Sequence, residues 1–205
     1  MNTKRALYIV FFTIFCILLL QTKDVKADSI SGFWSYEEYE DGTIGITAYS
    51  GLDEDIGIPA QINGKKVVKI ASEAFKNNIN IKTVEIPSTV TTIGAQAFAG
   101  SGLISVTIPE TVTTWESDYR FVPSLHFYYD ICEVFAECEN LKTVVFNSQM
   151  VPNGCFSGCV SLETVMLGNR TQYIKEYAFE NDKNLLIVGC KRRFVGNRSI
   201  CICKL

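Results

Sequence analysis

The chain has 205 residues, of which 19 are basic and 22 acidic, so its formal net charge is −3. This length suits one domain and a leader. The charge is uneven, because residues 28–190 sum to −11 whereas the last fifteen residues carry five basic side chains and no acidic one. Phosphate binding needs a basic face, so the acidic body argues against nucleic acid as a partner.

The first 27 residues have the parts of a secretory leader. Lys4 and Arg5 precede an apolar run over residues 6–20, and Val25-Lys26-Ala27 supplies small residues for cleavage. The run is shorter than the roughly 20 apolar residues of an ordinary membrane span. We therefore interpret residues 1–27 as a signal peptide cleaved after Ala27, which predicts a secreted, extracellular or cell-surface protein. The alternative is that the leader stays uncleaved. We expect the protein to attach to a membrane only in that case, through the leader.

Residues 28–70 predict a cap of β-hairpins. Asp41-Gly42 precedes an alternating apolar run at residues 44–48, and Asn63-Gly64 lies between apolar runs at 56–58 and 67–70. Such pairs favour tight hairpins because both turn residues adopt positive φ. The open end of a repeat array has an unpaired strand edge and an apolar face that need cover. We expect four aromatic residues to provide it: Phe33, Trp34, Tyr36 and Tyr39.

Residues 71–190 contain a repeat in which phenylalanine is followed about six residues later by leucine or isoleucine, and then by valine. The phenylalanines are Phe75, Phe98, Phe135, Phe156 and Phe179. The anchors that follow are Ile81, Leu103, Leu141, Leu162 and Leu185, and the valines are Val84, Val106, Val144, Val165 and Val188. A period of 20–29 residues with this consensus predicts a leucine-rich repeat solenoid of the α/β type. We expect it to be predominantly β, with parallel strands, short helical or irregular turns, a β-hairpin N-terminal cap, and the phenylalanines stacked in the core.

In each repeat strand the anchor, the valine and a final apolar residue are expected to point inward. The residues between them point outward and are our candidate binding residues: Thr83, Glu85, Ser105, Thr107, Thr143, Val145, Thr164 and Met166. One column of this set is rich in hydroxyl groups, which suits hydrogen bonding to a ligand. The alternative is that hydroxyl residues stand there because threonine favours exposed strands.

An insertion at about residues 115–129 interrupts the repeat, because the valine spacing there is 38 instead of about 22. It is rich in aromatic residues and includes the chain's one histidine. Insertions in repeat arrays map to loops on one face, and aromatic and arginine residues dominate interface hot spots. The candidates here are Trp115, Arg120, His126 and Tyr128. The alternative is that the aromatic residues pack back onto the solenoid.

Seven of the eight cysteines follow the leader. Cys138 and Cys159 stand three residues after a repeat phenylalanine, in a column with Asn78, Ser101 and Asp182. We interpret this column as small residues that satisfy backbone groups of neighbouring coils. A disulfide from Cys190 to Cys201 or Cys203 is a further possibility in an oxidising compartment.

No constellation predicts catalysis or metal binding. His126 lies near Cys132 but has no orienting partner, and Cys155 with Cys159 lacks the second pair that zinc needs. We therefore expect neither enzyme activity nor a cofactor nor a metal, and keep an enzyme of undetected class as the weakest hypothesis.

Four stretches resemble the BspA-like leucine-rich repeat proteins. These are Ile-Gly-Ala-Gln-Ala-Phe at 93–98, the Phe-x-x-Cys-x-x-Leu forms at 135–141 and 156–162, and Leu-Lys-Thr-Val-Val-Phe at 141–146. The resemblance covers roughly residues 36–189. It implies a bacterial-type secreted or surface protein that binds a protein or glycan ligand at the cell surface and acts in adhesion.

The last residues depart from the family pattern. Residues 191–205 lose the repeat and form what we expect to be an irregular basic tail. A divergent cap, a truncation and a shifted reading frame all remain open. A structural spacer, or a fragment of a larger surface protein, is accordingly the alternative function.

Overall fold

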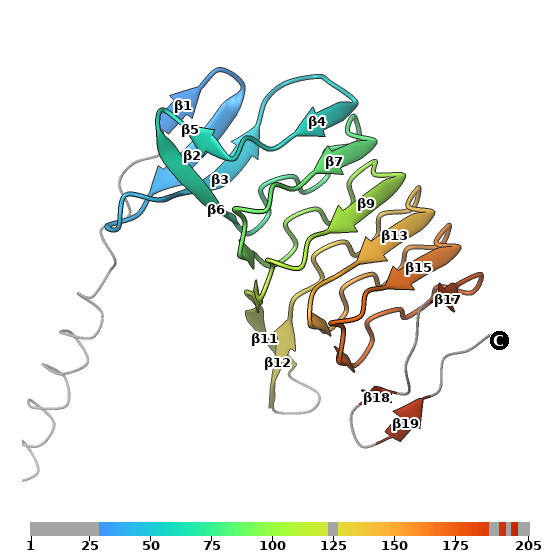
Figure 1. The fold of residues 1–205 in the computed structure, drawn as a ribbon. Helices are drawn as coiled ribbons and strands as arrows, with labels where there is room; N and C mark the ends of the chain where they lie inside the picture. The colour runs from blue at the N-terminus through green and yellow to red at the C-terminus, as the bar shows by residue number, and fades with distance from the viewer. Residues whose placement is uncertain (1–28, 123–126, 189–192, 196–197, 201–205) are drawn as a thin grey trace, which may run out of the picture.

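The computed structural model describes residues 29–122, 127–188, 193–195 and 198–200, and the regular structure in these ranges is entirely β-strand. Figure 1 shows the strands stacked as successive coils of a solenoid, with a hairpin-rich cap at the N-terminal end. Within the described ranges, no helix has the length and apolarity to cross a bilayer. The predicted signal peptide, residues 1–27, lies outside the described residues.

One side of the solenoid is a six-stranded sheet in the order β17-β15-β13-β9-β7-β4, and every neighbouring pair in it is parallel. Its strands are β4 (Asp55–Gly57), β7 (Thr83–Glu85), β9 (Ser105–Ile108), β13 (Thr143–Phe146), β15 (Thr164–Leu167) and β17 (Leu186–Val188). The predicted valines are in register from Val84 to Val165 and are buried. The register between β15 and β17 differs, because Val165 pairs with Ile187 and not with Val188.

The return side of the coils carries strands in two further sheets. The first has the order β1-β2-β3-β6-β8-β10, with β5 beside β6, and the second has the order β14-β16-β18-β19. The bounds in the first are β1 (Ser29–Ser31), β2 (Trp34–Glu38), β3 (Ile44–Tyr49), β5 (Gln61–Ile62), β6 (Lys65–Ile70), β8 (Thr92–Ile93) and β10 (Thr114–Trp115). Those in the second are β14 (Met150–Val151), β16 (Tyr173–Ile174), β18 (Arg193–Val195) and β19 (Arg198–Ile200). The described residues of the C-terminal tail thus form an antiparallel hairpin beside β16, whereas the sequence analysis predicts an irregular tail.

The segment that carries each repeat phenylalanine forms turns instead of a helix. In the first two coils, positive φ recurs four residues apart, at Glu73 and Asn77 and again at Gln96 and Gly100. A residue in the left-handed region interrupts a right-handed helix. The backbone bonds then run between coils, as from Phe75 N to Ala97 O at 2.7 Å. Each coil is therefore joined to the next by backbone hydrogen bonds on this side as well as in the six-stranded sheet.

The five repeat phenylalanines form a continuous stack, as the sequence predicts. Successive ring centroids lie 4.8 Å apart between Phe75 and Phe98, and 5.1, 5.3 and 5.4 Å apart in the following pairs. The interplanar angles are at most 8°. Four of the rings are fully buried and Phe179, at the C-terminal end, is partly exposed. The stack is the axis of the hydrophobic core.

The cap closes the N-terminal end of this stack. The Trp34 ring meets Phe75 edge-on at 6.3 Å and packs against Tyr49 at 4.5 Å. Tyr36 is buried, whereas Phe33 is 60% exposed and does not serve as cover. The hairpin turn at Asp41-Gly42 joins β2 to β3 as predicted.

The turn at Asn63-Gly64 has the expected positive φ values of 51° and 75°. It joins β5 to β6, however, and not the apolar run at 56–58 to β6. That run contains β4, which pairs with β7 as the outermost strand of the six-stranded sheet. The coil array therefore begins inside the segment that the sequence analysis assigns to the cap.

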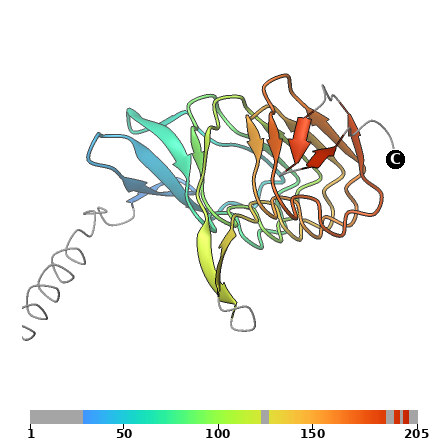
Figure 2. The same ribbon diagram turned by 90° about the horizontal axis from the view of Figure 1, so that it is seen from below.

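The insertion forms an antiparallel hairpin of β11 (Asp118–Val122) and β12 (Phe127–Ile131), which extends away from the coils in Figures 1 and 2. The preceding strand, β10, pairs with β8 so that Trp115 is in register with Ile93. Ile70 and Ile93 stand five residues before Phe75 and Phe98 and pair with each other on the return side. Five residues before Phe135 stands Asp130, but Trp115 takes the corresponding return position instead. The extra residues leave the coil after this position and return at Cys132, whose carbonyl accepts from Gln96 N.

The polar column beside the phenylalanine stack satisfies backbone groups of neighbouring coils. The Cys138 thiol donates to the Phe98 carbonyl, and the Cys159 thiol to the Phe135 carbonyl, each at 3.1 Å. Ser101 Oγ lies 3.3 Å from Cys138 Sγ. Both thiols are buried and free, which agrees with the structural role expected of them.

Asp182 continues the same column and makes folding dependent on pH. Both of its carboxylate oxygens are buried, and this burial raises its pKa from 3.8 to about 7, against a smaller opposing effect of the Cys159 backbone. The protonated form is favoured in the fold, so the contribution of Asp182 to stability is greatest below pH 4 and is lost as pH rises through 7. Asp182→Asn should therefore raise the melting temperature relative to the parent at pH 8 and change it least at pH 4. Exposed Glu180→Gln is the control, and an equal effect of Asp182→Asn at both pH values would contradict this prediction.

Candidate functional site

The outward face of the six-stranded sheet is hollowed into a groove of about 620 Å³, which we call the strand-face groove. It crosses four strands, from β4 to β13. Six predicted candidates are among its lining residues: Thr83, Glu85, Ser105, Thr107, Thr143 and Val145. The remaining two strand candidates, Thr164 and Met166, lie on β15 in register with Thr143 and Val145.

The groove has acidic side chains at one end and none that is basic. Asp55 on β4 and Glu85 on β7 are its two charged lining residues. Thr83 Oγ1 donates to Asp55 Oδ1 at 2.5 Å, which fixes one carboxylate beside the hydroxyl column. Asp55 carries no signal in the sequence period, because the 28-residue separation between Ile56 and Val84 hides β4 from the repeat.

Trp115 does not belong to the strand-face groove. Its ring stacks on Phe146 at 5.7 Å, and its Nε1 donates to Ser148 Oγ at 3.3 Å. Trp115 is half-buried on the return side. For this residue the structure therefore agrees with the alternative interpretation, in which the inserted aromatic residues pack back onto the solenoid. Arg120 and Tyr128 lie on β11 and β12, where the structure describes the backbone alone, and His126 falls outside the described residues.

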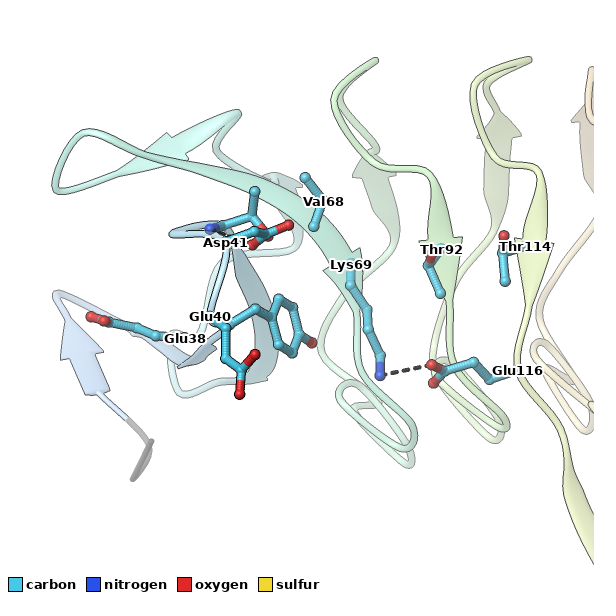
Figure 3. Close-up of a pocket in the computed structure, with 10 residues that line it drawn as sticks. Glu38, Glu40, Asp41, Val68, Lys69, Thr92, Thr114 and Glu116 are labelled. Atoms are coloured by element: carbon cyan, nitrogen blue, oxygen red, sulfur yellow. Dashed lines mark hydrogen bonds and ion pairs between the residues drawn. The ribbon is translucent and has the colours of Figure 1, made fainter. Parts of the chain in front are cut away.

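A second cavity, of about 420 Å³, lies between the cap and the return strands β6, β8 and β10. Figure 3 shows Lys69 reaching across it to Glu116, with the two groups 2.9 Å apart. Glu37 Oε1 lies 4.0 Å from the same ammonium, and the Tyr39 ring centroid lies 5.9 Å from it. Tyr39 donates a hydrogen bond to Glu37, and its burial strongly raises the pKa of its phenol. The chain's own lysine thus supplies the cation of this cavity and links the cap to the coils.

A third cavity, of about 320 Å³, lies at the base of the inserted hairpin and includes Trp115 and Cys132. Burial raises the pKa of the Cys132 thiol to about 12, so the group is not a ready nucleophile. Burial also raises the pKa of Cys155. Across the described ranges, no three histidine, cysteine or acidic residues are grouped as metal ligands. In the part of the chain that the structure describes, the geometry therefore offers a surface for contact.

Comparison with known families identifies the repeat. The model of the BspA type leucine-rich repeat region matches residues 54–124 and 131–195, in six copies. The chain belongs to the BspA-type leucine-rich repeat family. The match begins at β4 and is broken around the turn of the inserted hairpin, as the structure has it. Among curated proteins, none matches the chain.

Solved structures show the same fold. A leucine-rich cell surface protein of Faecalibacterium prausnitzii is 27% identical over 81% of this chain and 51% of its own, with a TM-score of 0.50. A leucine-rich repeat protein of Eubacterium ventriosum is 24% identical over 76% of this chain and 45% of its own, with a TM-score of 0.52. The pneumococcal vaccine antigen PcpA is 16% identical over 78% of this chain and 42% of its own, with a TM-score of 0.51. This BspA-type chain thus spans about half the length of these relatives.

Proposed function

We propose that this BspA-type protein is a secreted or cell-surface binding module without catalytic activity, which captures a protein ligand in the strand-face groove and serves adhesion. The observation that carries the proposal is the continuous groove of about 620 Å³ on a face whose backbone is already paired. Side chains from successive coils there offer a rigid, repeated set of contacts. The cell-surface relative from Faecalibacterium supports the location.

The test fills the groove without changing its charge. Ser105→Gln with Thr107→Gln should abolish capture of the ligand by the purified protein, because both side chains line the centre of the groove. The probes are purified collagen, fibronectin and laminin, and cell wall of the producing organism. The control is Glu139→Gln on an exposed turn, and circular dichroism establishes that each variant folds.

The opposite outcome favours a structural role. Capture that is unaffected by the two glutamines would place the contact elsewhere, and absence of capture from every probe would favour a spacer within a larger surface protein. In the first case the inserted hairpin is the next candidate. Trp115 is then a poor choice for mutation, since it packs on Phe146 and its loss would disturb the fold.

A further inference from the structure

Two columns of outward side chains cross the six-stranded sheet and change character along the solenoid. The strand register gives one column as Asp55, Thr83, Ser105, Thr143, Thr164 and Leu186, and the other as Gly57, Glu85, Thr107, Val145 and Met166. The first column runs from a carboxylate through four hydroxyl groups to the apolar Leu186, and the second runs from Glu85 through Thr107 to the apolar Val145 and Met166. Plain strand propensity does not produce such a gradient.

The acidic end is open to a cation. Glu85 is exposed and has no ion-pair partner among the described residues. The nearest lysine in sequence, Lys82, directs its ammonium away, to the Ile79 carbonyl at 2.9 Å. Because no basic side chain lines the groove, the negative potential of Asp55 and Glu85 is not cancelled there.

The apolar end is open to a hydrophobic side chain. Met166 is 45% exposed and Leu186 is 39% exposed, although the inward side chains of β15, on which Met166 stands, are buried. Methionine adapts its shape to a partner and is common at binding surfaces. Together with Val145, which lines the groove, they give an apolar surface continuous with the hydroxyl groups.

The middle of the groove suits a polypeptide backbone. Thr107 and Thr143 are exposed, and each hydroxyl both donates and accepts hydrogen bonds. The lining holds no aromatic side chain on which a sugar ring could stack. An extended peptide instead presents an amide or carbonyl at every residue, together with the side chains that the two ends require.

The spacing of strands fixes the spacing of those side chains. Glu85 and Met166 are separated by three strand intervals of about 4.8 Å each, or about 14 Å. An extended chain advances about 3.4 Å per residue, so about four residues cover this distance. We propose that the strand-face groove and the adjoining strand β15 bind an extended peptide segment that places a lysine or arginine against Glu85 and an apolar side chain against Met166, about four residues apart. This inference rests on the proposed binding function of the same groove.

In the test, peptides that bind the purified protein are selected from a library of random decapeptides. Peptides that lose binding to the variant carrying both Ser105→Gln and Thr107→Gln occupy the groove. Among these we expect a basic and an apolar residue about four positions apart to be enriched. Glu85→Lys should weaken the best of them about tenfold, while Glu139→Lys, which makes the same charge change on an exposed turn, should leave its affinity within about twofold.

The results distinguish failure of this inference from failure of the proposed binding function. Groove-bound peptides without this spacing, or with equal sensitivity to Glu85→Lys and Glu139→Lys, would overturn the inference and leave the binding function standing. Selected peptides that bind regardless of the two glutamines, or no selected peptide at all, would overturn both. Met166→Gln gives an independent arm, since it should weaken peptides with the apolar residue and spare those in which that residue is replaced by serine.

Discussion

Replacement of Phe135 by alanine should destabilise the protein by about 3–5 kcal/mol. The ring is fully buried and stacks on both Phe98 and Phe156, so its loss opens a cavity and removes two aromatic contacts. Equilibrium unfolding in urea, followed by circular dichroism, measures the change in free energy of unfolding.

The same variant should also alter the cooperativity of unfolding. In a repeat array each coil is stabilised mainly by its neighbours, so a defect in the middle uncouples the two halves. We expect a broader urea transition and a lower m-value, with loss of two-state behaviour. Phe33→Ala is the control, since Phe33 is mostly exposed and lies outside the stack. A Phe135→Ala protein as stable as the Phe33→Ala protein would show that the stack does not hold the coils together.

Replacement of Gly94 by alanine should cost about 3 kcal/mol, because it overpacks the contact between two coils. An added Cβ would lie 2.3 Å from Ser72 N and 2.7 Å from Ala71 C, both backbone atoms of the preceding coil. Backbone cannot move aside as a flexible side chain can, and Gly94 N also donates to Ile70 O at 2.8 Å. Thermal unfolding of the variant measures the cost.

Gly57→Ala is the matched control for this substitution. Gly57 stands in β4, and an added Cβ there would meet nothing closer than Glu85 Oε2 at 4.0 Å. It should therefore leave the melting temperature close to that of the parent. Equal stability of the two alanine variants would mean that the coils do not approach each other as closely at Gly94 as the structure has it.

The regular coils of the fold could be predicted from sequence because their core positions recur in step. The phenylalanine stack and the parallel register of Val84, Val106, Val144 and Val165 follow directly from that period. The sequence predicts short helical or irregular turns for the return segments, and the irregular form is the one the structure has. The structure has non-glycine residues such as Glu73 in the left-handed region, a backbone state that composition does not reveal.

The irregular segments could not be predicted because long-range pairing decides them. Counting five residues back from Phe135 leads to Asp130, yet Trp115 takes the core position through its pairing with β8. Likewise β4 belongs to the repeat sheet through pairing with β7, across a 28-residue separation. The outward strand residues followed from the alternation along a strand, but the acidic end at Asp55 became visible only when β4 was placed.

The two rows of backbone bonds between coils have a mechanical consequence. A pull along the solenoid axis loads these bonds in their own direction, so they break in succession and the coils detach singly. A folded coil occupies about 5 Å of the axis, while its 22 or so residues extend to about 75 Å when released. A tether built in this way lengthens in steps under tension and absorbs work at each step, while the coils still folded keep their shape.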